Sequence, residues 1–149
     1  MESNPGVVFR IIPPENLDSI LPLVKILNPS LEESVLWQRL QEMPAQGYQC
    51  VGGYRDERLV AICGMWITTR FYCGKQLEPD NVIVHPDFRS TGLGQRLMEW
   101  VYEFARAQNC EVCELNAYVT NSPAHRFYLQ QGFAILGFHF QKKLATPTR

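Results

Sequence analysis

A strand-like run followed by a short glycine-containing turn is the most informative segment of this sequence. Val82, Ile83 and Val84 are apolar and β-branched, and the turn Arg89–Gly94 opens an amphipathic helix. Backbone N–H groups in such a turn point outward with the positive end of the helix dipole behind them, so they attract a phosphate. The two glycines of the turn let a phosphate approach the backbone closely. The segment therefore predicts an anion site that can hold a pyrophosphate.

Two familiar nucleotide motifs do not account for this turn. It is not a P-loop, because no Gly-Lys-Ser/Thr sequence follows it. It is a poor dinucleotide fingerprint, since Leu97 stands where the third glycine should fall. An ordinary strand-to-helix turn remains the alternative, and the turn alone does not exclude it.

A second segment predicts a short helix with a polar aromatic group on one side. Asn121 or Ser122 is suited to cap the helix, Pro123 to its first turn and Gly132 to the position just after its end. Tyr128 follows Asn121 by seven residues, which is about two helical turns along the same side. A hydroxyl group is therefore expected beside an apolar surface.

Together the two segments resemble the GNAT superfamily of acetyl-CoA-dependent N-acetyltransferases. The resemblance lies in the pattern V-x-P-x-x-R-x-x-G-x-G followed by N-x-x-A-x-x-F-Y-x-x-x-G-F. One departure is Ser90, because many members have glycine after the arginine. The residues that carry the pattern are Val84, Pro86, Arg89, Gly92 and Gly94, then Asn121, Ala124, Phe127, Tyr128, Gly132 and Phe133.

The resemblance implies acetyl-CoA as the cosubstrate and assigns residues to it. The backbone of the turn would hold the pyrophosphate, and the preceding strand would lie along the pantetheine arm and offer an N–H group to the thioester carbonyl. That strand and the strand before Asn121 would splay apart to admit the thioester. The residues implied to bind the coenzyme are Val82, Ile83, Val84, Arg89, Ser90, Thr91, Gly92, Leu93, Gly94, Asn121 and Tyr128.

The resemblance also implies a reaction in which an amine attacks the acetyl group directly while both substrates are bound. Tyr128 stands at the family's tyrosine position and would protonate the leaving thiolate, since a phenol stays protonated at neutral pH. Asp80 or Glu78, on the strand before the turn, would take the proton of the amine, directly or through water. The sequence does not decide between the two carboxylates. A non-catalytic module that senses acyl-CoA is the alternative function.

The elements that must position these residues predict an α+β fold. We expect a single domain over residues 1–149, with a mixed, mostly antiparallel sheet of six to seven strands and about four helices on both faces. Ser30–Glu33 predicts a capping box, and Pro79 a bulge or an edge position. Val112–Val119 is expected to form one strand, and Phe133–Leu144 two short ones.

Composition excludes several other classes of function. With 14 basic and 15 acidic residues, the chain lacks the positive excess of a nucleic-acid or anionic-membrane binder. No secretory signal or apolar run long enough for a membrane span is seen, and the odd number of cysteines, five, favours reduced thiols in a cytoplasmic protein. No metal site is expected. The sequence leaves open the amine acceptor (a small molecule or a peptide), the use of longer acyl groups and whether the chain is a homodimer.

Overall fold

The computed structural model describes residues 6–145, and these fall into two compact units. The first unit ends at Leu115 and the second begins at Asn116. The N-terminal segment Met1–Pro5, in which the sequence predicts no secretory signal, lies outside the described residues. The single domain over residues 1–149 stays a prediction.

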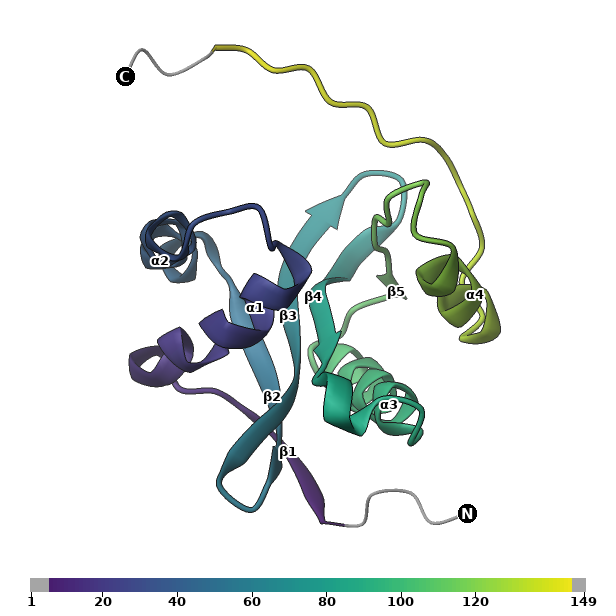
Figure 1. Cartoon of the computed structure of the whole chain (residues 1–149). Coiled ribbons are helices and arrows are strands. Elements are labelled where there is room, and N and C mark those ends of the chain that lie inside the picture. The colour runs from purple at the N-terminus through teal and green to yellow at the C-terminus, as the bar shows by residue number, and fades with distance from the viewer. Residues whose placement is uncertain (1–5, 146–149) are drawn as a thin grey trace. The chain divides into compact units, whose positions relative to one another are not determined.

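The first unit is built on a five-stranded sheet with the order β1-β2-β3-β4-β5 (Figure 1). The first four strands are antiparallel neighbours, and β5 runs parallel to β4. Strands β2 and β3 form a hairpin whose turn needs no glycine, because Asp56 adopts a left-handed φ of 55°. The strands are β1 (Val7–Ile11), β2 (Gln49–Arg55), β3 (Arg58–Arg70), β4 (Gly74–Val84) and β5 (Val112–Cys113).

The expectation of six to seven strands is wrong for the described residues. The strand predicted over Val112–Val119 stops at Cys113, after which only the Glu114 N–H still bonds to the sheet, at the Leu77 carbonyl (3.1 Å). The two strands predicted within Phe133–Leu144 do not form. Alternating apolar residues predict a chain that can pleat, but a strand also requires a neighbouring backbone to bond with, and among the described residues this segment has none.

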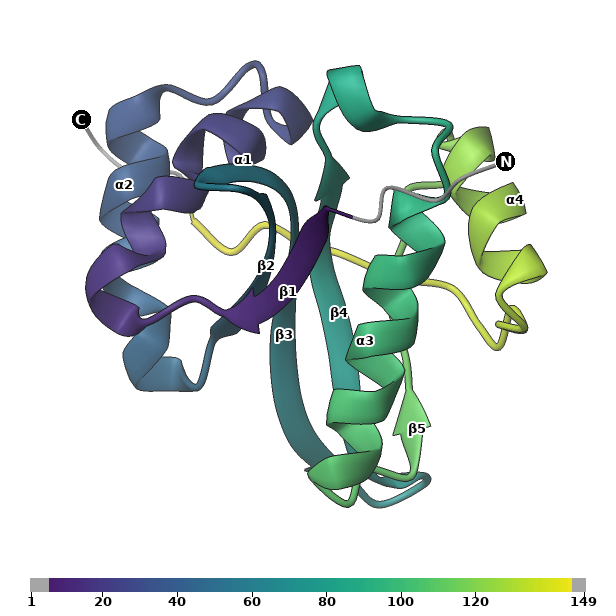
Figure 2. The same ribbon diagram turned by 90° about the horizontal axis from the view of Figure 1, so that it is seen from below.

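Helices cover both faces of this sheet, as expected (Figures 1 and 2). The 3₁₀-helix η1 (Pro14–Ile20), α1 (Leu21–Leu27) and α2 (Glu33–Glu42) lie on one face, and α3 (Leu93–Ala107) lies on the other. Pro22 is tolerated because it lies in the first turn of α1. The capping box predicted at Ser30–Glu33 is wrong. The helix begins later, with Glu32 as its cap residue and no side-chain capping bond, so Ser30 lies too far from the first helical N–H groups.

Two apolar clusters fill the spaces between the sheet and its helices. One joins α3 to the sheet and includes Leu93, Leu97 and Val101. The other lies against η1, α1 and α2 and includes Tyr48, Ile62 and Ile83. Because neighbouring residues of a strand point to opposite faces, β3 and β4 supply side chains to both clusters. These two strands are thereby held firmly at the centre of the unit.

The second unit contains the predicted short helix, α4 (Ser122–Gln130). The Asn121 carboxamide oxygen accepts the Ala124 N–H at 3.3 Å, so Asn121 is the cap. Pro123 lies in the first turn, and Gly132 follows the helix with a left-handed φ of 95°. The start and stop signals in the sequence are therefore confirmed. Within residues 6–145, no helix is long and apolar enough to cross a membrane.

Candidate functional site

Strand β4 carries an irregularity next to the predicted acid residues. Ile62 pairs with Ile83 and Gly64 pairs with Asp80, so two residue steps on β3 face three on β4. Asn81 takes up the additional residue with a left-handed φ of 55°, which asparagine tolerates better than most residues. Pro79 keeps a regular pairing with Met65, so the bulge lies at Asn81. Pro79 lies beyond the pairing with β5, which is the edge position named as the other alternative.

One edge of β4 is left unpaired where its pairing with β5 ends. Strand β5 pairs only with Gln76 and Leu77, although β4 continues to Val84. From Glu78 onward, no strand of the first unit pairs with the edge of β4 that faces away from β3. An open edge of this kind presents backbone donors and acceptors that an extended ligand can bind in the manner of an added strand. Val82, Ile83 and Val84 lie on this stretch of β4.

The turn after β4 has the geometry of an anion site. A 3₁₀ turn, η3 (Pro86–Phe88), is followed by Ser90 and Gly92, both with left-handed φ values (63° and 80°). The first backbone bond of α3 is donated by Arg96, and no backbone N–H of residues 90–95 has an acceptor within the described chain. A Cβ added at Gly92 would meet nothing within 4 Å. Unsatisfied N–H groups at the positive end of a 15-residue helix favour a phosphate in this space.

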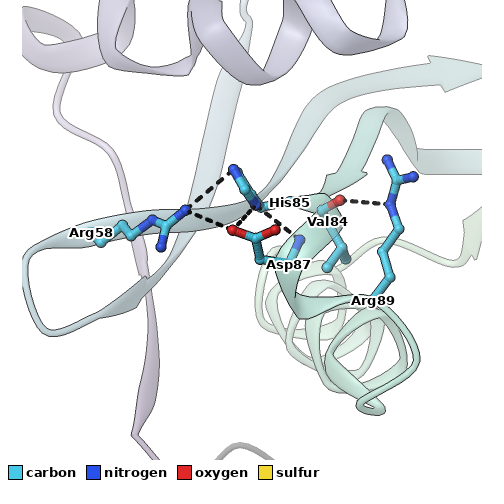
Figure 3. Close-up of polar contacts among 5 residues, drawn as sticks. All are labelled: Arg58, Val84, His85, Asp87 and Arg89. Carbon is cyan, nitrogen blue, oxygen red and sulfur yellow. Dashed lines mark hydrogen bonds and ion pairs between the residues drawn. The ribbon is translucent and has the colours of Figure 1, made fainter.

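Polar contacts hold the start of this turn against two strands (Figure 3). The Arg89 Nε donates to the Val84 carbonyl at 3.1 Å, so this side chain ties the turn to the end of β4. The Asp87 N–H donates to His85 Nδ1 (3.1 Å), and Arg58 approaches both His85 Nε2 (3.3 Å) and the Asp87 carboxylate (3.5 Å). The Arg58–Asp87 pair is exposed, so it contributes little to stability. Arg58 is the first residue of β3, and no local sequence pattern predicts its contact with Asp87.

Asp80 is held by an aromatic residue of the neighbouring strand β3. The Trp66 indole N–H donates to Asp80 Oδ2 at 3.0 Å. The Trp66 ring in turn packs against Tyr48, with centroids 5.1 Å apart, and Tyr48 approaches Asn81 Oδ1 at 3.5 Å. Burial raises the pKa of Tyr48 far above its ordinary value, so its phenol stays protonated. The other candidate base, Glu78, lies opposite Trp66 on the neighbouring strand.

The remaining predicted residues belong to the second unit. Tyr128 is half-buried, with the rings of Phe127 and Phe133 edge-on to it at 5.2 and 5.5 Å. The side-chain oxygen of Asn121 is engaged in capping α4. The structure therefore brings the candidate bases, the open edge and the turn together on β4 and its continuation, and it places Tyr128 and Asn121 on α4. No group of three or more metal-ligating side chains occurs within residues 6–145.

Comparison with known proteins gives one family for most of the chain. The model of the Acetyltransferase (GNAT) family matches residues 19–133, a range that contains β2–β4, the turn and α4. The fold agrees with this match. The ribosomal-protein-alanine N-acetyltransferase of Brucella melitensis superposes with a TM-score of 0.78 at 17% identity, over 93% of this chain and 99% of that one.

The relatives that are similar in sequence include the following two N-acetyltransferases. The aminoalkylphosphonate N-acetyltransferase of Salmonella typhimurium is 36% identical over 67 residues, which is 45% of this chain and 44% of that protein. The match thus spans less than half the length of that enzyme. An uncharacterized N-acetyltransferase of Bacillus subtilis is 25% identical over 123 residues, covering 81% of this chain and 87% of its own length.

Proposed function

Because this chain belongs to the acetyltransferase (GNAT) family, we propose that it transfers the acetyl group of acetyl-CoA to a primary amine. The observation that carries the proposal is the open edge of β4, which leads directly into a turn with unsatisfied N–H groups. An extended arm that ends in a pyrophosphate fits that combination, because the arm needs a strand-like partner and the pyrophosphate needs clustered donors. Acetyl-CoA supplies an acetyl group activated as a thioester.

The residues proposed to hold the coenzyme are those of the edge and the turn. The backbone of Val82–Val84 binds the amides of the arm, and one of its N–H groups donates to the thioester carbonyl oxygen as negative charge develops there. The backbone of Arg89–Gly94 binds the pyrophosphate. Arg89 acts through its side chain by fixing the turn to Val84. Asn121 supports the site by fixing the start of α4.

Proton transfers at the amine and at the leaving thiolate complete the proposed reaction. An amine of reference pKa near 10 is protonated at neutral pH, so Asp80 or Glu78, directly or through water, takes its first proton and frees the lone pair on nitrogen. The nitrogen then forms the C–N bond as the C–S bond breaks, and Tyr128 gives its proton to the departing thiolate. The second proton that the nitrogen loses in forming the amide returns to the Tyr128 oxygen, directly or through water. Holding both substrates together removes the entropic part of the barrier.

The acceptor is proposed only as a class, a small-molecule or peptide amine. The Salmonella relative acts on aminoalkylphosphonates, and its likeness to part of this chain puts such compounds in the first test set beside simple diamines and peptides. A cytoplasmic location and a homodimer stay predictions, as does the use of longer acyl groups.

A thiol-release assay tests the function. Free CoA is measured after acetyl-CoA is mixed with the protein and a panel of aminoalkylphosphonates, alkyl diamines, amino acids and lysine peptides. We expect at least one amine to raise CoA release well above the rate without amine. Tight acetyl-CoA binding without release across the panel would instead support the acyl-CoA sensor, which shares the same turn and edge.

A further inference from the structure

We propose that Trp66 is a positioning residue that acts through Asp80 and makes Asp80, not Glu78, the base. This inference rests on the proposed acetyl transfer. The indole N–H to Asp80 Oδ2 bond of 3.0 Å carries it. The indole N–H donates and the Asp80 carboxylate oxygen accepts, so the contact fixes the direction in which the carboxylate points.

The contact is a diagonal one between neighbouring strands. In the register of β3 and β4, Trp66 lies opposite Glu78, whereas Asp80 lies opposite Gly64. Diagonal neighbours lie roughly 7–8 Å apart, within reach of a long aromatic side chain. Although Glu78 is the directly facing residue, the indole donates to Asp80. The direction of this one donor distinguishes the two carboxylates.

Packing keeps the indole in this orientation. The Tyr48 ring lies against Trp66 at a tilt of 56° and passes over Gly64. A Cβ added at Gly64 would come within 2.4 Å of the Tyr48 hydroxyl and 2.7 Å of the Asp80 carbonyl oxygen. The absence of a side chain at Gly64 thus allows Tyr48 to reach Trp66. The contact with Tyr48 therefore fixes the Trp66 ring, and the bond to Asp80 fixes the direction of the indole N–H.

A double-mutant cycle tests whether Trp66 works through Asp80. Trp66→Phe keeps an aromatic ring and removes the donor, so kcat with the best amine of the panel should fall about tenfold or more, with little change in the KM for acetyl-CoA. In an Asp80→Asn background the same change should cost almost nothing further, whereas in a Glu78→Gln background it should cost its full amount. Full additivity with Asp80→Asn, or coupling to Glu78→Gln instead, would overturn the proposal.

A measurement without turnover separates this proposal from the proposed function. The chain has three tryptophans, so its indole N–H resonances are few, and Trp66→Phe identifies the one that belongs to Trp66. That resonance should move in Asp80→Asn and stay in Glu78→Gln. An unmoved resonance in Asp80→Asn contradicts the positioning role even in an active enzyme. Absence of acetyl transfer to any amine contradicts the proposed function, and the catalytic part of the inference with it.

Discussion

At the scale of single residues, the candidate chemistry depends on groups of two kinds. Asp80 is oriented by a side-chain donor, while the turn offers backbone N–H groups that need no particular side chain. The turn and the capped helix could be predicted because their signals are local: glycines, a proline and an asparagine at fixed spacings. Trp66 could not, because its contact with Asp80 depends on the register of two strands and on the bulge at Asn81.

Replacement of Tyr128 by phenylalanine tests the proposed acid. Removing the hydroxyl leaves the ring packed against Phe127 and Phe133, so folding should be little affected. We expect kcat to fall about 100-fold because the thiolate must leave without a positioned proton donor. The measurement is CoA release under saturating substrates.

The matched control is Tyr118→Phe, which removes the hydroxyl of an exposed tyrosine in the same unit. It should leave kcat unchanged. Acetyl-CoA affinity should stay within about twofold in both variants, because the proposed proton transfer from Tyr128 acts on the departing thiolate and not on the bound thioester. Equal kcat values for Tyr128→Phe and the wild type would remove Tyr128 from the mechanism.

At the scale of elements, the features that could be predicted are those formed by residues close along the chain. Helix α3 and the β2–β3 hairpin follow from periodicity and from neighbours in sequence. The extent of β5 did not follow, since apolar alternation over Val112–Val119 continues although its pairing with β4 ends at Cys113. The same pairing limit leaves open the β4 edge on which the proposed coenzyme site depends.

The turn before α3 can be tested at Gly92. Its φ of 80° costs a residue with a side chain about 1–2 kcal/mol, and the added methyl group would project into the open space of the anion site. Gly92→Ala should therefore lower stability by about that amount and weaken CoA binding at least tenfold. Calorimetric titration with CoA and urea unfolding measure the two effects.

Gly132→Ala is the matched control for Gly92→Ala. Gly132 also has a left-handed φ (95°) with open space at its Cβ, but it follows α4 and belongs to the second unit. It should show a similar loss of stability with unchanged CoA affinity. Equal weakening of CoA binding in both variants would mean that strain alone, and not the position in the turn, accounts for the effect.

The crossing of Tyr48 over β3 is tested at Gly64. An added methyl group would overlap the Tyr48 ring and the β4 backbone, and overpacking of this kind costs about 1–3 kcal/mol. Gly64→Ala should lower stability accordingly and reduce kcat by displacing Trp66 or Asp80. Gly137→Ala, at a position with open space, should do neither. A Gly64→Ala variant with the wild-type midpoint in urea would contradict the close packing described here.

At the scale of the whole molecule, buried thiols give the fold a dependence on alkaline pH. Burial raises the pKa of Cys50 from 9.0 to about 12 and the pKa of Cys63 well above 9.0. The unfolded chain loses these protons first, so the stabilisation is full below about pH 9 and is lost as pH rises towards 12. Urea unfolding under reducing conditions should show stability falling by roughly 1 kcal/mol per pH unit for each such thiol.

Cys50→Ala removes one of these titrations and keeps the other. Its stability should decline less steeply above pH 9 than that of the wild type, whatever its value at neutral pH. Identical slopes would show that the Cys50 thiol does not titrate as its burial requires.

The central claim, transfer of one acetyl group from acetyl-CoA to an amine, is tested most directly by product stoichiometry. Acetyl-CoA labelled with deuterium in the acetyl group is mixed with the protein and the best amine of the panel, and both free CoA and labelled amide are quantified by mass spectrometry. One labelled N-acetyl product per CoA released, with neither formed at a comparable rate without amine, is the predicted result. CoA release that does not depend on the amine and yields no amide would contradict it.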